Sequence, residues 1–190
     1  MDAQAAWHDA GVDDHALVEA VLGGDRDAFR LIVERAQGPV FRASLRILGS
    51  VSDAEDVAQE SFLIAFRSLG TYRGQGSLQA WLVRIATRNA FRRRSQRRPS
   101  ADLAAAVDRP TPAAADPLHV VMAEERHVAV RSAVEALDEP YREVIALRYF
   151  GELSLEEVAM TTGRPLNTIK TQLRRGLQRL AGAVETEVAT

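Results

Sequence analysis

Apolar residues recur at three- and four-residue steps along most of this chain, the spacing of α-helices that bury one face. Within residues 16–48 these positions are Leu17, Val21, Phe29, Ile32, Val33, Val40, Leu45 and Leu48. No stretch alternates apolar and polar residues as a half-buried strand would, and no Asn-Gly hairpin turn occurs. The sequence therefore predicts an all-α fold.

One long segment interrupts this periodicity. Residues 97–117 contain four of the seven prolines and many alanines. Proline fixes φ and removes an amide donor, so an extended segment is expected here. We predict two small helical domains, at 12–97 and 120–186, joined by a flexible linker at 98–119.

Composition excludes several classes of protein. The chain has no cysteine, which rules out disulfides and thiolate metal sites and fits a reducing compartment. Its N-terminus is acidic without an apolar core, and its apolar runs are too short to span a membrane. We expect a cytoplasmic protein without membrane insertion, metal or cofactor.

Charge is strongly segregated although the net charge is only −2. No acidic residue occurs from Ser61 to Ala101, or from Val158 to Val184. The first of these segments holds nine arginines: Arg67, Arg73, Arg84, Arg88, Arg92, Arg93, Arg94, Arg97 and Arg98. Two basic surfaces favour a polyanion contacted in two places, although solvated arginine faces would give the same pattern.

An acidic stripe precedes the first basic segment. In "SVSDAEDVAQESFLIAFRSLG", Ser52 and Glu55 have the spacing of a capping box. Four polar residues then share one side of the predicted helix: Asp53, Asp56, Gln59 and Glu60. The stripe is a candidate protein contact; helix capping and solvation are the alternative.

The basic segment combines a glycine loop with an arginine-rich helix. In "TYRGQGSLQAWLVRIATRNAFRRRSQRR", Gly74 and Gly76 predict a flexible loop and Ser77 a helix cap. Arginines at four-residue steps can bind phosphates, and neighbouring polar and aromatic groups can stack on bases, as in single-strand binding. The candidates are Tyr72, Arg73, Gln75, Ser77, Arg84, Arg88, Asn89 and Arg92. Trp81 fits either the core or the DNA-facing side.

The stretch "SLEEVAMTTGRPLNTIKTQLRRGLQRL" predicts two helices around a sharp turn. Ser154 and Glu157 form a second capping box, Gly163 ends that helix, and Pro165 prevents its continuation. We expect Asn167 to cap the next helix. A small residue at Ala159, the turn glycine and a buried Ile169 fit a helix-turn-helix. Its outer side would carry Asn167, Thr168, Lys170, Thr171, Arg174, Arg175 and Arg179.

In this order, these motifs resemble bacterial sigma factors of the extracytoplasmic-function group, in the sigma-70 family. "DAEDVAQESF" is similar to the segment that grips the polymerase clamp, and "YRGQGSLQAWLVRIATRNAFRRRSQRR" to the −10 reader of sigma region 2. "LDEPYREVIALRYFGELSLEEVAMTTGRPLNTIKTQLRRGLQRL" is similar to sigma region 4, which reads the −35 element. The chain departs from the family pattern at Arg164, Asn167 and Leu177.

The resemblance implies a promoter-specificity subunit without a catalytic centre. Its partners would be core RNA polymerase, through the β′ clamp and β flap, and promoter DNA, both duplex and single-stranded; an anti-sigma factor is a further candidate. By position, the acidic stripe would contact polymerase, the loop and arginine helix the −10 strand, and the last helix the −35 duplex.

Two other functions remain open from the sequence. A helix-turn-helix regulator acting without polymerase would use only the C-terminal domain, with a ligand site in the first. A hydrolase would use Asp53, Asp56 and Glu60, but the four histidines lie outside the motifs and form no catalytic spacing.

Overall fold

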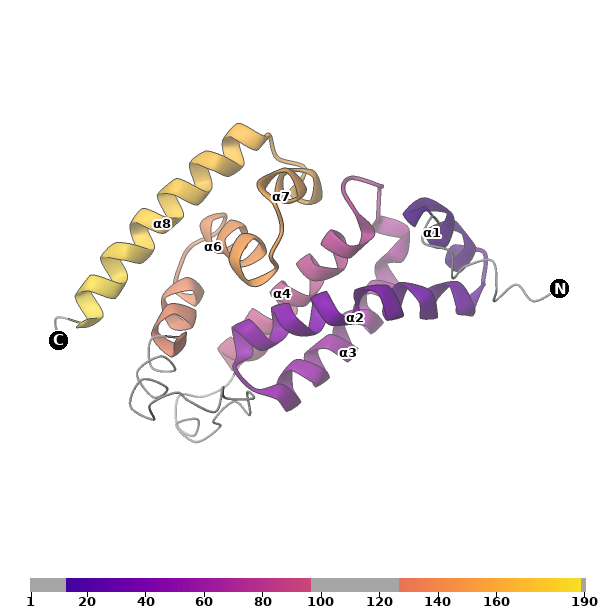
Figure 1. The fold of residues 1–190 in the computed structure, drawn as a ribbon, viewed down its shortest axis with the longest axis horizontal. Helices are drawn as coiled ribbons and strands as arrows, with labels where there is room; N and C mark the ends of the chain where they lie inside the picture. Colours follow the sequence, from indigo (N-terminus) through magenta and orange to yellow (C-terminus); the bar gives the residue numbers. More distant parts are fainter. Residues whose placement is uncertain (1–12, 97–126, 189–190) are drawn as a thin grey trace, which may run out of the picture.

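The computed structural model describes residues 13–96 and 127–188, with side chains as far as residue 182. The N-terminal half (13–96) consists of α1 (Asp14–Leu22), α2 (Arg26–Leu48), α3 (Val51–Ser68), the 3₁₀ turn η2 (Leu69–Thr71) and α4 (Leu78–Gln96). The C-terminal half (127–188) consists of a helical segment at 127–135, α6 (Tyr141–Ile145), the π-helical turn η3 (Ala146–Phe150), α7 (Leu155–Thr162) and α8 (Leu166–Val188) (Figure 1). These described residues contain no strand, so the all-α prediction is confirmed.

Local capping fixes the ends of α2 and α3. The Asp25 carboxylate accepts from the amides of Asp27 and Ala28, and α2 ends at Gly49 with φ 74°. Ser50 caps α3 by accepting from the Asp53 amide at 3.4 Å. The predicted capping box at Ser52 and Glu55 is therefore wrong, because the helix already begins at Val51.

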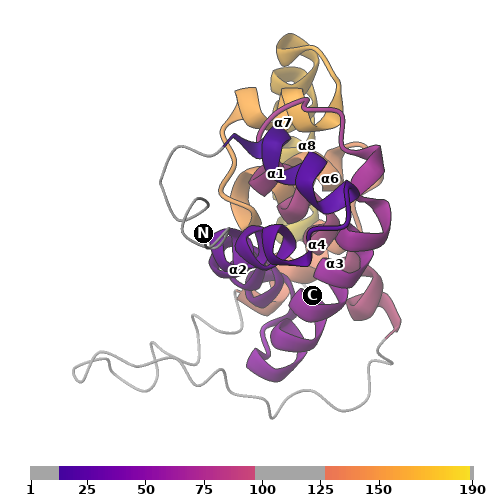
Figure 2. The same cartoon turned by 90° about the vertical axis from the view of Figure 1, so that its right-hand side faces the viewer.

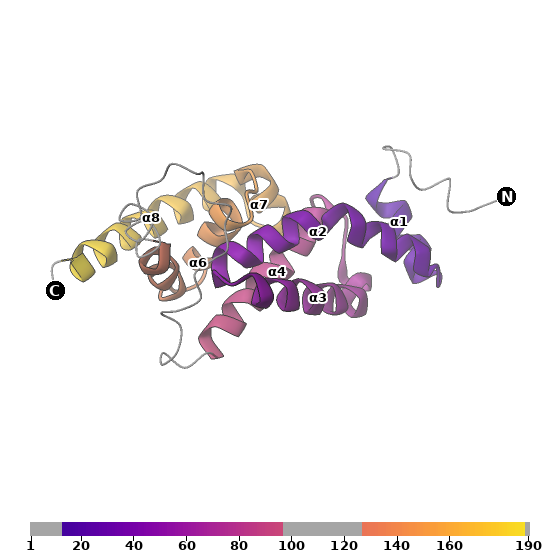
Figure 3. The same ribbon diagram turned by 60° about the horizontal axis from the view of Figure 1, so that its bottom comes forward.

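Within each half, the helices pack directly against one another. Helices α2, α3 and α4 form a bundle, and α1 packs on α2. In the C-terminal half, α6 lies between α8 and the N-terminal bundle (Figures 1 and 3). Gly176 allows α8 to approach α6, since a Cβ there would lie 2.9 Å from Ile145 Cδ1. None of the described helices is long and apolar enough to cross a membrane.

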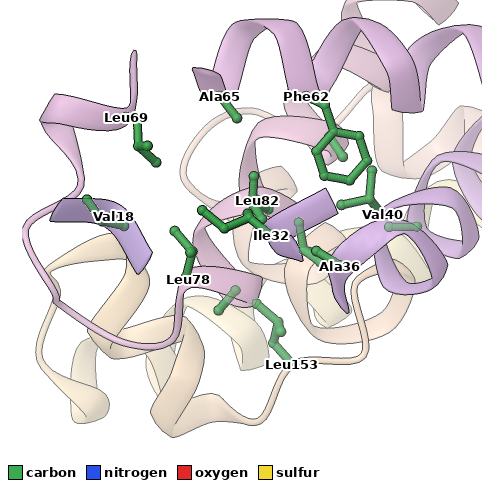
Figure 4. Packing of buried hydrophobic residues seen from close by; sticks show 14 of the residues in the cluster. Val18, Ile32, Ala36, Val40, Phe62, Ala65, Leu69, Leu78, Leu82 and Leu153 are labelled. Carbon is green, nitrogen blue, oxygen red and sulfur yellow. The ribbon is translucent and has the colours of Figure 1, made fainter. Parts of the chain in front are cut away.

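The two halves share their apolar core. One buried cluster joins Ile32 and Leu82 of the N-terminal half to Leu153 of the C-terminal half (Figure 4). Ile169 of the C-terminal half belongs to the same cluster. A second cluster joins residues of α2 and α4 to Val134 and Ile145, among others. The sequence predicts two domains but not this contact between them. The predicted linker at 98–119 lies outside the described residues, as does the stretch 120–126 of the second predicted domain.

Candidate nucleic-acid interface

The C-terminal half contains the predicted helix-turn-helix. Ser154 and Glu157 form the predicted capping box at the start of α7, with bonds of 2.8 and 3.1 Å between each side chain and the other's amide. Gly163 ends α7 with φ 69°, and the Arg164 amide donates to Ala159 O at 3.1 Å. The next helix begins at Leu166, so Asn167 lies inside its first turn and does not cap it. Pro165 precedes the helix, and its carbonyl accepts from the Thr168 and Ile169 amides.

One face of α8 is basic and open to solvent, while Ile169 is fully buried. The exposed residues include every predicted −35 position: Asn167, Thr168, Lys170, Thr171, Arg174, Arg175 and Arg179. Lys170 and Arg174 border an open groove of about 470 Å³ against α7. Arg179 differs from them, since it approaches Asp138 at 3.5 Å and stacks on the Tyr141 ring at 4.3 Å.

The loop between η2 and α4 passes beside α7 (Figures 1 and 2). Tyr72 donates from its hydroxyl to Gly76 O at 2.8 Å, and its ring lies 5.7 Å from that of Trp81. Burial, and then the negative charges of Asp14 and Asp13, raise the pKa of the Tyr72 hydroxyl above its ordinary value. Arg73 and Gln75 are exposed on this loop.

Helix α4 receives two caps. Ser77 accepts from the Ala80 amide at 3.1 Å, as the sequence predicts. Asp14 of α1 accepts from the Leu78 amide at 2.7 Å, which the sequence analysis did not identify. The carboxylate of Asp14 and the hydroxyl of Ser77 both complement the positive N-terminal end of the helix dipole. Trp81 is only partly buried and packs against the apolar core.

The arginines at four-residue steps on α4 do not share one surface. Four residues overshoot a helical turn by about 40°, so the row drifts around the helix. Arg84 donates to Glu143 and to Thr161 O in the C-terminal half, at 2.9 and 2.7 Å. Arg88 is exposed, whereas Arg92 folds back onto Glu60 of α3 at 2.8 Å.

Asn89 is 4% exposed and points into the bundle, and its predicted contact with DNA stays a prediction. Its amide nitrogen donates to Ser61 Oγ at 3.3 Å and to Val57 O at 3.5 Å, and its oxygen accepts from Arg92. A buried amide with these partners is a packing element of α3 and α4.

The predicted acidic stripe on α3 also contains both exposed and buried residues. Asp56, Gln59 and Glu60 are exposed, but Asp53 is 7% exposed and faces α4. Arg93 of α4 lies 3.8 Å from the carboxylates of both Asp53 and Asp56. An apolar groove of about 380 Å³ runs beside Gln59 between α2 and α3. Among the described residues, no group of three or more acidic or histidine side chains could hold a metal ion.

The chain matches two family models, Sigma-70 region 2 over residues 32–99 and Sigma-70 region 4 over residues 127–180. The RNA polymerase sigma-H factor of Pseudomonas aeruginosa is 30% identical over 181 residues, which cover 90% of this chain and 94% of that protein. The chain belongs to the extracytoplasmic-function group of the sigma-70 family. The resemblance inferred from its motifs is thereby confirmed.

Other relatives of this sigma factor agree. The ECF RNA polymerase sigma factor SigW of Bacillus subtilis is 32% identical over 172 residues, covering 86% of this chain and 92% of that protein. The solved structure of CnrH in complex with the cytosolic domain of CnrY has the same fold, with a TM-score of 0.59 at 22% identity. That likeness covers 91% of this sigma factor and 97% of CnrH.

Proposed function

We propose that this sigma factor binds core RNA polymerase and directs promoter-specific transcription initiation. Its N-terminal half would read the −10 element as sigma region 2, and its C-terminal half the −35 element as sigma region 4. The observation that carries the proposal is the basic, solvent-exposed face of α8, which follows directly on the turn at Gly163. We propose no catalytic role for any residue.

The −35 duplex would meet the N-terminal part of α8. Asn167 and Thr168 lie in its first turn, where the positive end of the helix dipole attracts phosphate. Lys170, Arg174 and Arg175 are one to three turns along and exposed, so they can reach base edges in the major groove. Thr171 lies beside them. Arg179 is further along and would contact phosphates, since its side chain is still half exposed beside Asp138.

The −10 strand would meet the loop before α4. Arg73, Gln75 and Arg88 are exposed and can hold phosphates or bases, with Tyr72 and Ser77 shaping the loop. Unstacking a base costs a few kcal/mol, which contacts to the captured base can offset. Arg84 and Arg92 would join only after leaving their glutamate partners, and Asn89 remains in the bundle.

Core polymerase would meet the exposed part of the α3 stripe, namely Asp56, Gln59 and Glu60, next to the apolar groove between α2 and α3. Asp53 is too buried to take part and would instead position Arg93. We propose the β′ clamp as the partner of this surface and the β flap as the partner of the C-terminal half. An anti-sigma factor would compete for the same surfaces.

Reconstitution with core polymerase tests the function. The wild-type chain should start transcripts at a defined set of genomic positions that core polymerase alone does not use. Asp56→Lys with Glu60→Lys should weaken polymerase association, while Asp27→Lys with Glu34→Lys, on the exposed side of α2, should not. A helix-turn-helix regulator would instead bind duplex DNA tightly without polymerase and leave the start sites unchanged.

A further inference from the structure

Helix α1 places a carboxylate at the first residue of α4. Asp14 Oδ2 accepts from the Leu78 amide at 2.7 Å, although the two residues are 64 apart in sequence. The first amides of a helix have no acceptor within the helix, so a partner from elsewhere stabilises them. A carboxylate is a stronger acceptor than a neutral oxygen. Asp14 therefore fixes the point where α4 begins, directly after the loop at 72–77, which we call the −10 loop.

The same helix packs against the other end of the −10 loop. Val18 of α1 belongs to the buried cluster that contains Leu69 of η2 and Leu78 of α4 (Figure 4). Leu22, at the end of α1, reaches Gly70 of η2, since its Cδ2 would lie 3.9 Å from a Cβ there. Residues of α1 thus contact the chain on both sides of the loop.

Between these two anchors the −10 loop has little to hold its conformation. The Tyr72 hydroxyl donates to Gly76 O at 2.8 Å. Gly74 and Gly76 have φ of 69° and 81°, in the left-handed region that glycine enters without a steric cost. Glycine also has many other conformations available, and anchors at the ends of the loop restrict them. Asp14 lies close enough to the loop for its charge to raise the pKa of the Tyr72 hydroxyl, after the larger effect of burial.

We propose that Asp14 is a positioning residue for promoter opening. By fixing the start of α4, it holds the −10 loop in the conformation in which Arg73 and Gln75 capture an unpaired base. This role rests on the proposed function, since opening at the −10 element is the step that the loop would perform. Asp14 acts through the Leu78 amide and touches no DNA. A loop that adopts the capturing conformation only part of the time captures less well in proportion to that fraction.

Electrostatics alone predicts the opposite effect for a change at this site. Asp14 is a negative charge beside a surface that would bind DNA, so removing it would lessen repulsion and favour opening. Loss of positioning would disfavour opening. Loss of a helix-capping acceptor shifts an equilibrium by about 5-fold, so we expect Asp14→Ala to slow promoter opening by that factor.

Two further variants separate position from charge. Asp13→Ala removes the same charge one residue earlier, where the side chain is exposed and makes no capping bond. Asp14→Asn removes the charge but keeps an oxygen that can accept from the Leu78 amide. We expect Asp13→Ala to open promoters at least as fast as wild type. Asp14→Asn should recover most of the wild-type rate.

The experiment uses holoenzyme assembled from core polymerase and each full-length variant, on a promoter mapped with the wild-type chain. A fluorescent base in the −10 element reports opening, and the dependence of its rate on holoenzyme concentration separates duplex binding from the opening step. Asp14→Ala should slow the opening step about 5-fold and leave duplex affinity and polymerase association unchanged. In the free chain, hydrogen exchange at the Leu78 amide should be faster in Asp14→Ala and unchanged in Asp13→Ala.

Equal opening rates for Asp14→Ala and Asp13→Ala would overturn the proposal, and so would faster opening in Asp14→Ala, which would indicate a charge effect. A loss of polymerase association that matches the loss of opening would also overturn it, because Asp14 would then only stabilise the fold. A wild-type holoenzyme that opens no promoter would overturn the proposed function and this role with it. Faster exchange at Leu78 in Asp14→Ala would in that case still show that α1 braces the loop.

Discussion

At the scale of single residues, the role of each arginine on α8 depends on whether a side chain that can bind its guanidinium lies beside it. Arg174 and Arg175 are exposed on the outer face of α8, whereas Arg179 lies against Asp138 and Tyr141. A guanidinium without a fixed partner can turn its planar fork toward a guanine edge. One that already stacks on a ring keeps its orientation and contributes to packing. Residues of one type on one helix therefore have different roles.

Replacing these arginines should separate the roles. Arg174→Ala or Arg175→Ala should relax preference at particular −35 base pairs by about 1–3 kcal/mol, the usual value of a bidentate contact. Arg179→Ala should weaken binding evenly and lower stability by ~0.5–1 kcal/mol, through the lost ring contact. Selection of −35 variants with each protein, and with exposed Gln178→Ala as control, measures both effects. An unchanged −35 preference in the Arg174 and Arg175 variants would make α8 a backbone clamp.

The hydroxyl of Tyr72 offers a second residue-scale prediction. Tyr72→Phe removes the bond to Gly76 O, so the free energy of unfolding should fall by about 1 kcal/mol. The ring remains, and so does its contact with Trp81. Tyr149→Phe is the matched control, because Tyr149 is 50% exposed and should cost almost nothing. Equal denaturation midpoints for the two variants would show that the loop does not depend on this bond.

At the scale of the elements, the boundaries that the sequence predicts well are those set by local chemistry. The capping box at Ser154 and the left-handed glycine at Gly163 each depend on neighbours within a few residues, and both are confirmed. Predictions at Ser52 and Asn167 are wrong by about two residues, because another residue that can begin the helix stands just before each.

Contacts between residues far apart in the sequence cannot be predicted from local capping and turn residues. Arg84 and Glu143 are 59 residues apart, and nothing in either segment marks them as a pair. The interior position of Asn89 follows from the register between α3 and α4, which the apolar pattern does not specify. The sequence thus predicts the all-α class, the family and the exposed face of α8. It does not predict which arginines are paired with glutamates inside the protein.

Two glycines, one in the turn of the helix-turn-helix and one further along α8, should respond oppositely to alanine. Gly163→Ala should destabilise the protein by about 1 kcal/mol, because φ is 69° there and a Cβ is unfavourable in that region. Gly182→Ala should stabilise it by up to ~1 kcal/mol, since the residue is within α8 and a Cβ would meet nothing within 4 Å. Chemical denaturation followed by circular dichroism measures both. A Gly163→Ala variant as stable as wild type would contradict this role for the turn.

At the scale of the whole molecule, the shared core couples the two halves. Leu153 is 3% exposed and comes from the C-terminal half, yet it packs in the cluster that contains Ile32 and Leu82 (Figure 4). Two halves that bury apolar surface against each other stabilise one another by the free energy of that contact. The independent folding that a proline-rich linker favours is therefore opposed by the packing.

Leu153→Ala should show this coupling. Loss of a buried leucine costs about 2–5 kcal/mol, and here the loss should be felt in both halves. In a Trp7→Phe background, Trp81 reports the N-terminal half alone, while circular dichroism reports all helices. We expect the two unfolding curves to coincide in the parent chain and to shift together in the Leu153→Ala variant. Leu63→Ala, at an exposed leucine of α3, is the control and should shift neither curve appreciably. If Trp81 keeps its midpoint while the dichroism curve shifts, the halves unfold independently and their contact contributes little to stability.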